Sequence, residues 1–187
     1  MSAELRDSLE RIARIFVESR RIAQDMGPAA AMHEVKVGAV LLRVAKWAEA
    51  RFGRAATVSA ETPSNTHVLV RGGVSNLERI LENLVLNAYE GDGRRAASEV
   101  TIRSKDAPVG FVTIEVADNG PGFSEDALGR RISAFATTKT DGSGLGLYTA
   151  ERLVVASGGQ LIRANAPQGG AIVRVTANDL PVYCPNP

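Results

Sequence analysis

The stretch that most constrains this chain is DGSGLGLYTAERL, residues 141–153, in which three glycines lead directly into an apolar helical pattern. Glycine costs about 1 kcal/mol relative to alanine inside a helix, so its repetition at a helix start needs a separate reason. Successive backbone N–H groups of a glycine-rich turn form a concave anion site, and the helix adds the positive end of its dipole. The stretch predicts a polyphosphate cradle, although it lacks the Lys-Ser/Thr pair that follows the last glycine of a P-loop.

The composition favours one globular domain with an appendage. The chain has 187 residues, of which 44% are hydrophobic and 23% charged, and its formal net charge is +1. This charge gives no electrostatic reason to expect binding to nucleic acid or to an anionic membrane, and no apolar run approaches the length of a membrane span. The only cysteine, Cys184, precludes an internal disulfide, so we expect a reducing, cytoplasmic setting.

Hydrophobic periodicity divides the remainder of the chain into helices and strands. It predicts helices over 38–52, over 74–90 and from the glycine-rich stretch to residue 157, with Gly53 and Gly91 as stops for the first two. The segments with strand character are 56–61, 67–71, 99–104, 110–118, 160–164 and 170–177. Three helices and five or six strands indicate a sheet with helices on one face.

Residues 1–26 predict a further helix of heptad character, closed by Gly27-Pro28. Its a and d positions are Leu5, Leu9, Ile12, Phe16, Ser19, Ala23 and Met26. One such helix cannot bury its own apolar stripe, so it needs either the rest of the chain or a second copy. Both alternatives are open at this point. We expect two parts, a helix over 1–28 and a domain over 29–187.

Two asparagines in ENLVLNAYE share one face of the third helix. Asn83 and Asn87 are four residues apart, and their carboxamides offer neutral oxygens to a hard cation such as Mg²⁺. The alternative is a pair of ordinary surface or capping asparagines, because short motifs match by chance.

A carboxylate follows an alternating strand in VADNGPGF. Asp118 at the strand end can accept a hydrogen bond from an exocyclic amine, and Gly120 and Gly122 let the backbone approach a flat ring. A simple Asn-Gly turn is the alternative. Lys139, just before the glycine-rich stretch, can supply a mobile positive charge. In this order the segments provide a metal site, a base-recognition site and a phosphate cradle, the parts that an ATP·Mg²⁺ site needs.

These motifs resemble the catalytic ATP-binding domain of sensor histidine kinases, in the superfamily shared with DNA gyrase, the mismatch-repair ATPase and a heat-shock chaperone. NLVLNA is similar to the N box, DNGPGF to the first glycine box, FATTK to the F box and GSGLGL to the second glycine box. The form is closest to the nitrogen-regulation type, and the resemblance runs from about residue 35 to 181. It implies an α+β fold, a two-layer α/β sandwich of the Bergerat type with a mixed sheet covered by helices on one face.

The resemblance also implies roles for individual residues. Asp118 would bind the adenine amino group, Asn87 and Asn83 would hold Mg²⁺, and Asn83 and Lys139 would take part in catalysis, with Lys139 reaching the terminal phosphates. The other nucleotide-binding positions would be Gly120, Gly122, Thr138, Gly142, Ser143, Gly144, Leu145 and Gly146. Residues 124–143 would form a mobile lid that closes over the nucleotide.

The chain departs from the family pattern in two ways. Many members carry a basic residue three positions after the second N-box asparagine, where this chain has Glu90. No acceptor histidine is evident either, because His33 is followed by a single helix before the N box and His67 lies in a strand candidate. Residues 1–26 instead resemble the second helix of a dimerisation hairpin, and the acceptor is expected outside this chain.

The sequence therefore predicts a protein-histidine kinase domain that transfers the γ-phosphoryl group of ATP to a histidine on a dimerisation helix of the same or a partner kinase. The phosphate would then pass to a response regulator receiver domain, and this fragment alone should autophosphorylate poorly or not at all. A homodimer through residues 1–26 fits this organisation. The alternative is a non-catalytic nucleotide-binding signalling module, a degenerate kinase. A chaperone- or topoisomerase-like ATPase is disfavoured because it would need an acidic residue at Asn83.

Overall fold

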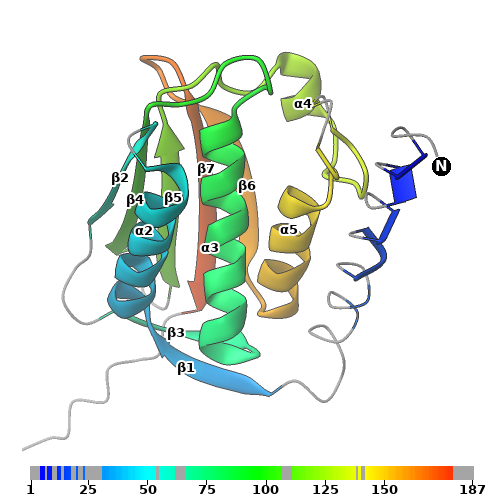
Figure 1. Ribbon diagram of the computed structural model, residues 1–187. Helices are drawn as coiled ribbons and strands as arrows, with labels where there is room; N and C mark the ends of the chain where they lie inside the picture. The colour runs from blue at the N-terminus through cyan, green and yellow to red at the C-terminus, as the bar shows by residue number, and fades with distance from the viewer. Residues whose placement is uncertain are drawn as a thin grey trace, which may run out of the picture.

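The computed structural model describes residues 31–53, 55–61, 66–106, 111–137, 139 and 142–178, together with residues 5, 6, 8, 9, 12, 13, 15–17, 20 and 23. Within them, a five-stranded sheet forms one layer and three helices cover one of its faces (Figure 1). These helices are α2 (Val37–Phe52), α3 (Gly73–Glu90) and α5 (Gly146–Ala156). The two-layer α/β fold expected from the sequence is confirmed.

The strands form two sheets rather than one. The larger has the order β2 (Thr57–Glu61), β4 (Glu99–Asp106), β5 (Phe111–Asp118), β7 (Ala171–Asn178) and β6 (Gln160–Asn165). It is mixed, because β2 and β4 are parallel while the other neighbours are antiparallel. A separate pair joins β1 (Met32–Lys36) to β3 (His67–Arg71).

Strand β1 was not among the expected strands. Only Val35 of its five residues is buried, so the segment lacks the alternation that marks a half-buried strand. Its pairing with β3 places His33 opposite Val70 and His67 opposite Lys36. Neither histidine lies on a helix, which agrees with the expectation that neither is a phosphoacceptor.

Helix α3 lies between α2 and α5 and spans the height of the sheet (Figure 1). Its apolar residues recur at helical spacing and are buried, among them Leu77, Leu81 and Leu84. Burying each such side chain stabilises the fold by roughly 1.5–3 kcal/mol. The helix ends at the predicted Gly91, whose N–H donates to Asn87 O. The last turn of α3 lies close to the chain that follows β5, because a Cβ on Gly91 would be 3.1 Å from Pro121 Cδ.

A short helix, α4 (Glu125–Gly129), lies in the segment expected to form the lid, where periodicity predicted no helix. Ser124 caps it by accepting a hydrogen bond from Ala127 N at 3.1 Å, and two acidic residues occupy its first turn. Five residues are too few to produce a helical hydrophobic period, which is why periodicity did not indicate it.

The described residues between 5 and 23 are helical, as predicted. Leu5, Leu9, Ile12 and Phe16 of the heptad stripe are 49–70% exposed. These apolar side chains are thus left largely exposed. Within the described part of the chain, no helix is both long and apolar enough to traverse a bilayer.

A buried carboxylate lies on the sheet face opposite to the helices. Ile114 and Val116 of β5 point into the core, so Glu115 between them points to the other side. Glu115 accepts hydrogen bonds from Arg103 Nε on β4 at 2.6 Å and from Arg174 Nε on β7 at 2.8 Å. Burial raises the pKa of Glu115, but these two guanidinium groups outweigh it and hold the pKa below its usual value.

Because folding lowers this pKa, ionised Glu115 stabilises the protein above its usual pKa, and this stability is lost as the pH falls through the lowered value. Glu115→Gln is expected to reduce the free energy of unfolding at neutral pH by about 1–3 kcal/mol, because charge-assisted hydrogen bonds are lost. It should also flatten the decline of stability between about pH 5 and pH 3. Urea denaturation across this range measures both effects. Glu99→Gln, at an exposed position of β4, is the control, and an equal effect there would contradict the assignment.

Candidate functional site

The lysine of the F-box-like segment contacts the last turn of α3. Lys139 Nζ donates hydrogen bonds to Asn87 Oδ1 at 3.2 Å and to Glu90 Oε2 at 3.0 Å. The lysine side chain is 16% exposed. Two residues that the sequence placed in one site, 52 positions apart, are thus brought into contact.

The second amide of the N-box-like motif has different neighbours. Asn83 Nδ2 donates to Arg79 O at 2.9 Å, one turn back along α3. Its Oδ1 lies 3.2 Å from the position that a Cβ on Gly146 would take, so it faces the first residue of α5. The two asparagines share a helix face as predicted, but one contacts the lysine and the other faces the glycine-rich helix start.

The start of α5 has the features of an anion site. No side chain caps the helix, and its first intrahelical bond runs from Thr149 N to Leu145 O at 2.7 Å. The N–H groups of the first turn therefore have no intrahelical acceptor. Leu145 anchors this end of the helix in the core with 1% exposure. Ser143 Oγ accepts a hydrogen bond from Leu145 N at 3.2 Å.

Gly144 allows the preceding chain to pass close to this helix start. Its φ is +66°, and a Cβ there would lie 2.5 Å from Phe135 C and 2.7 Å from Phe135 Cα. Phe135 N donates to Gly144 O at 3.1 Å. Phe135 itself has φ +65°, a left-handed conformation that is uncommon for a bulky residue. The two box-like motifs around 135 and 144 are therefore packed backbone to backbone.

Asp118, at the end of β5, is held in one orientation. Its Oδ1 accepts hydrogen bonds from Gly120 N at 2.9 Å and from Ala171 N at 3.1 Å. Burial raises the pKa of Asp118, and the two backbone donors offset this only in part. Because both donors reach Oδ1, the other carboxylate oxygen, Oδ2, is the one left to accept a further hydrogen bond.

The hairpin of β6 and β7 contacts the DNGPGF segment and holds it in place. The sequence did not indicate this contact. Asn165 Oδ1 accepts from Phe123 N at 2.7 Å, and Asn165 Nδ2 donates to Phe123 O at 2.8 Å. A Cβ on Gly170 would lie 1.8 Å from Asp118 O, so only glycine fits there. The turn composition of NAPQGG, between β6 and β7, is typical of a hairpin loop but does not indicate which segment the hairpin contacts.

The asparagine next to the carboxylate has a structural role. Asn119 Oδ1 accepts hydrogen bonds from Ser98 N at 3.0 Å and Glu99 N at 3.1 Å, which ties the end of β5 to the start of β4. These bonds fix the backbone that carries Asp118, and the chain bends at residues 119 and 120.

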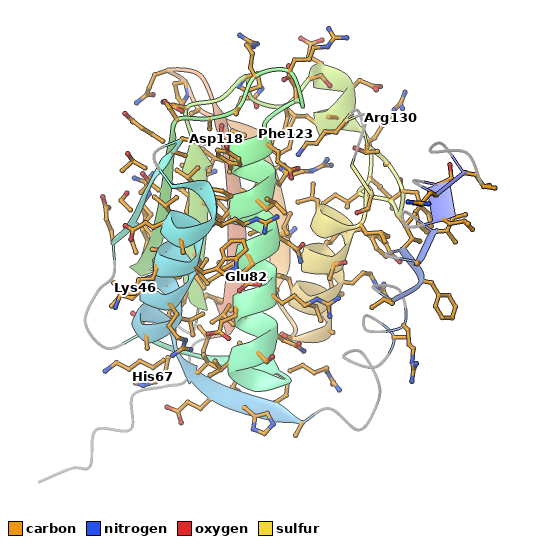
Figure 2. All side chains as sticks on the ribbon, viewed as in Figure 1. Lys46, His67, Glu82, Asp118, Phe123 and Arg130 are labelled. Carbon is orange, nitrogen blue, oxygen red and sulfur yellow. The ribbon has the colours of Figure 1, made fainter. Side chains whose placement is uncertain are left out.

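The candidate residues gather around the C-terminal end of α3. A Cβ on Gly91, which ends this helix, would lie 3.1 Å from Pro121 Cδ, so the helix end and the DNGPGF turn are adjacent. Asp118 and Phe123 lie beside this end of α3 in Figure 2. Gly142 lies beside Lys139, because a Cβ on the glycine would be 3.0 Å from Lys139 Cβ. Thr138, also predicted in the site, lies outside the described residues.

Comparison with known proteins agrees with this arrangement. The family model of histidine kinase-, DNA gyrase B- and HSP90-like ATPases matches residues 72–181, from the start of α3 to beyond β7. The chain belongs to this family. This range contains the four box-like motifs, so the matched segment includes the residues of the candidate site.

Relatives of this domain include sensor proteins. The C4-dicarboxylate transport sensor protein DctB of Rhizobium meliloti (strain 1021) is 34% identical over 164 residues, which are 86% of this chain and 25% of the relative. DctB of Pseudomonas aeruginosa is 43% identical over 110 residues, which are 57% of this chain and 18% of the relative. The chain thus spans about a quarter or less of these relatives.

Solved structures show the same fold. Full-length ShkA in complex with AMPPNP has a TM-score of 0.76 at 26% identity, covering 98% of this chain and 39% of ShkA. The nucleotide-free catalytic domain of the histidine kinase ThkA has a TM-score of 0.67 at 22% identity, covering 81% of this chain and 99% of that domain. The chain is thus similar in sequence to sensor proteins and in fold to histidine kinase catalytic domains.

Proposed function

We propose that this domain binds ATP together with Mg²⁺ and transfers the γ-phosphoryl group to a histidine on a dimerisation helix. The observation that carries the proposal is the gathering of three kinds of group at one end of α3. Asn87 and Lys139 are in contact there, Asn83 faces the uncapped start of α5, and Asp118 is oriented beside them. An amide oxygen suits a hard cation, an uncapped helix start suits phosphate, and a fixed carboxylate suits the adenine amine.

The residues present fit a magnesium site. Asn87 Oδ1 already accepts a hydrogen bond from an ammonium group, so this oxygen lies where a cation is stabilised. Among the described residues, no group of three or more His, Cys, Asp or Glu side chains could hold a metal ion. The proposed ligands are Asn87 and Asn83, whose amide oxygens suit a hard cation, and phosphate oxygens and water would supply the remaining ligands. When bound, Mg²⁺ would neutralise phosphate charge.

In the proposed reaction, an imidazole nitrogen attacks the γ-phosphorus. A phosphorus–nitrogen bond forms while the bond to the β,γ-bridging oxygen breaks, ADP leaves, and the imidazole proton passes to a base beside the acceptor. Lys139 and the first N–H groups of α5 would stabilise the charge on the transferred group. The phosphoryl group would pass next to an aspartate of a response regulator receiver domain. We propose that this phosphoryl transfer takes place in the cytoplasm.

The exposed stripe of the N-terminal helix supports a homodimer. Leu9, Ile12 and Phe16 lie on it and are 49–70% exposed, and isolated helices of this length rarely persist without a partner. We therefore propose that residues 1–28 are a dimerisation helix and that residues 29–187 are the catalytic domain.

The test has two stages. A fluorescent ATP analogue is titrated into the protein with and without Mg²⁺, and labelled ATP is then supplied together with the dimerisation hairpin of a related sensor kinase. We expect Mg²⁺-dependent binding, little autophosphorylation and transfer to the added hairpin, with Asn87→Ala lowering affinity by about tenfold or more in the presence of Mg²⁺. Absence of binding would refute the proposal. Binding without transfer would favour the non-catalytic signalling module.

A further inference from the structure

The ammonium group of Lys139 occupies a closely packed position at the end of α3. It lies 3.2 Å from Asn87 Oδ1 and 3.0 Å from Glu90 Oε2. A Cβ on Gly93 would lie 3.2 Å from Lys139 Cγ, and one on Gly142 would lie 3.0 Å from Lys139 Cβ. Glycines on both sides thus leave room for the lysine stem, which is why so flexible a side chain is mostly buried.

This position of Lys139 is incompatible with two proposed roles, the binding of Mg²⁺ by Asn87 and the binding of phosphate by Lys139. Asn87 Oδ1 cannot hold a divalent cation while the ammonium group lies 3.2 Å from it, because the two cations repel each other. Lys139 likewise cannot pair with a terminal phosphate while it is bound to α3. The ammonium group is stabilised in this position, because a carboxylate and the C-terminal end of a helix both favour a cation.

We propose that Glu90 is a positioning residue that holds Lys139 on Asn87 in the nucleotide-free domain, and so weakens the binding of ATP·Mg²⁺. This inference rests on the proposed function. Binding exchanges the Glu90–Lys139 ion pair for a pair between Lys139 and phosphate, while the metal takes the place of the ammonium group at Asn87. Glu90 thereby neutralises the charge of Lys139 within the protein when no phosphate pairs with it.

Glu90→Gln should therefore tighten the binding of a fluorescent ATP analogue with Mg²⁺ by about 1.5- to fivefold, the range expected for one partly exposed ion pair. Glu90→Asp keeps the charge but shortens the reach, and should give an intermediate affinity. The matched control is Asp92→Asn, which removes the same charge two residues further on. Asp92 accepts only from Arg94 N and Arg95 N among the bonds described here, so its variant should bind like the wild type.

A double-mutant cycle separates positioning from simple repulsion between Glu90 and the triphosphate. In a Lys139→Met background, Glu90→Gln should no longer change affinity, because no ammonium remains to be held. A gain that persists in that background, or weaker binding by Glu90→Gln alone, would overturn the inference. Thermal unfolding of each variant checks that the fold is retained. Failure of the wild type to bind nucleotide would refute the proposed function. Nucleotide binding without the expected effects of the Glu90 variants would refute only this inference.

Discussion

Asp118→Asn is expected to weaken ATP binding by about a hundredfold or more while the domain stays folded. A hydrogen bond to a charged group contributes about 1.5–3 kcal/mol, and each 1.4 kcal/mol is a factor of ten. The structure adds a second reason. Gly120 N and Ala171 N both donate to Oδ1, so the oxygen of an asparagine must stay there and its NH₂ group must take the place of Oδ2. That NH₂ would face the adenine amine, donor against donor.

The same geometry predicts a change of specificity. ITP carries a ring carbonyl oxygen where ATP carries the amine, so the Asp118→Asn protein should prefer ITP to ATP, the reverse of the wild type. Fluorescence competition titrations with both nucleotides measure this. Glu34→Gln is the control, because Glu34 lies on β1, beside the N-terminal end of α3 (Figure 1), and its side chain is 60% exposed. Unchanged ATP affinity in the Asp118→Asn protein would refute the adenine assignment.

Gly170→Ala is expected to lower the free energy of unfolding by roughly 2–6 kcal/mol, from backbone strain and overpacking together. Gly170 has φ +90°, and a Cβ there would lie 1.8 Å from Asp118 O. Strand β7 must then move away from the end of β5, and the bond from Ala171 N to Asp118 Oδ1 at 3.1 Å is lost. Nucleotide affinity should fall as well, because Asp118 is no longer held. Urea denaturation and nucleotide titration measure the two effects.

The neighbouring glycine is a closely matched control. Gly169 has φ +95°, but no atom lies within 4 Å of the Cβ position. Gly169→Ala should therefore cost only the strain of a left-handed backbone, about 1–3 kcal/mol, and leave nucleotide binding intact. Equal losses in the two variants would show that the contact with Asp118 is unimportant.

The elements that periodicity predicted well are those in which one face of a segment meets the core. The 74–90 helix prediction matches α3 because its leucines recur at helical spacing, and the alternation of 110–118 matches β5. By contrast, β1 buries a single side chain and α4 has only five residues, so neither carries a period that could be read. The division of the strands into two sheets depends on pairing between β1 and β3, which is a non-local choice.

The candidate site likewise has features that the sequence predicted and features that it did not. The residue types and their order already indicated a metal site, a base-recognition site and a phosphate cradle, because each motif is a local chemical pattern. The contacts of Asn165 with Phe123 and of Gly170 with Asp118 join segments that carry no mutual signal. The ion pair of Lys139 with Glu90 spans 49 positions, and Glu90 was noted only as a departure from the family pattern.

The sequence by itself determined which chemical groups this domain carries, where its main helices and strands run, and to which family it is similar. Helical spacing, strand alternation and glycine placement act over a few residues, so they can be read from the chain directly. Only the tertiary structure decided which oxygen of Asp118 is left to accept a further hydrogen bond, what holds the DNGPGF turn, and where Lys139 rests. Those outcomes depend on side chains from separate elements competing for the same hydrogen bonds and space, which is settled when the elements pack together.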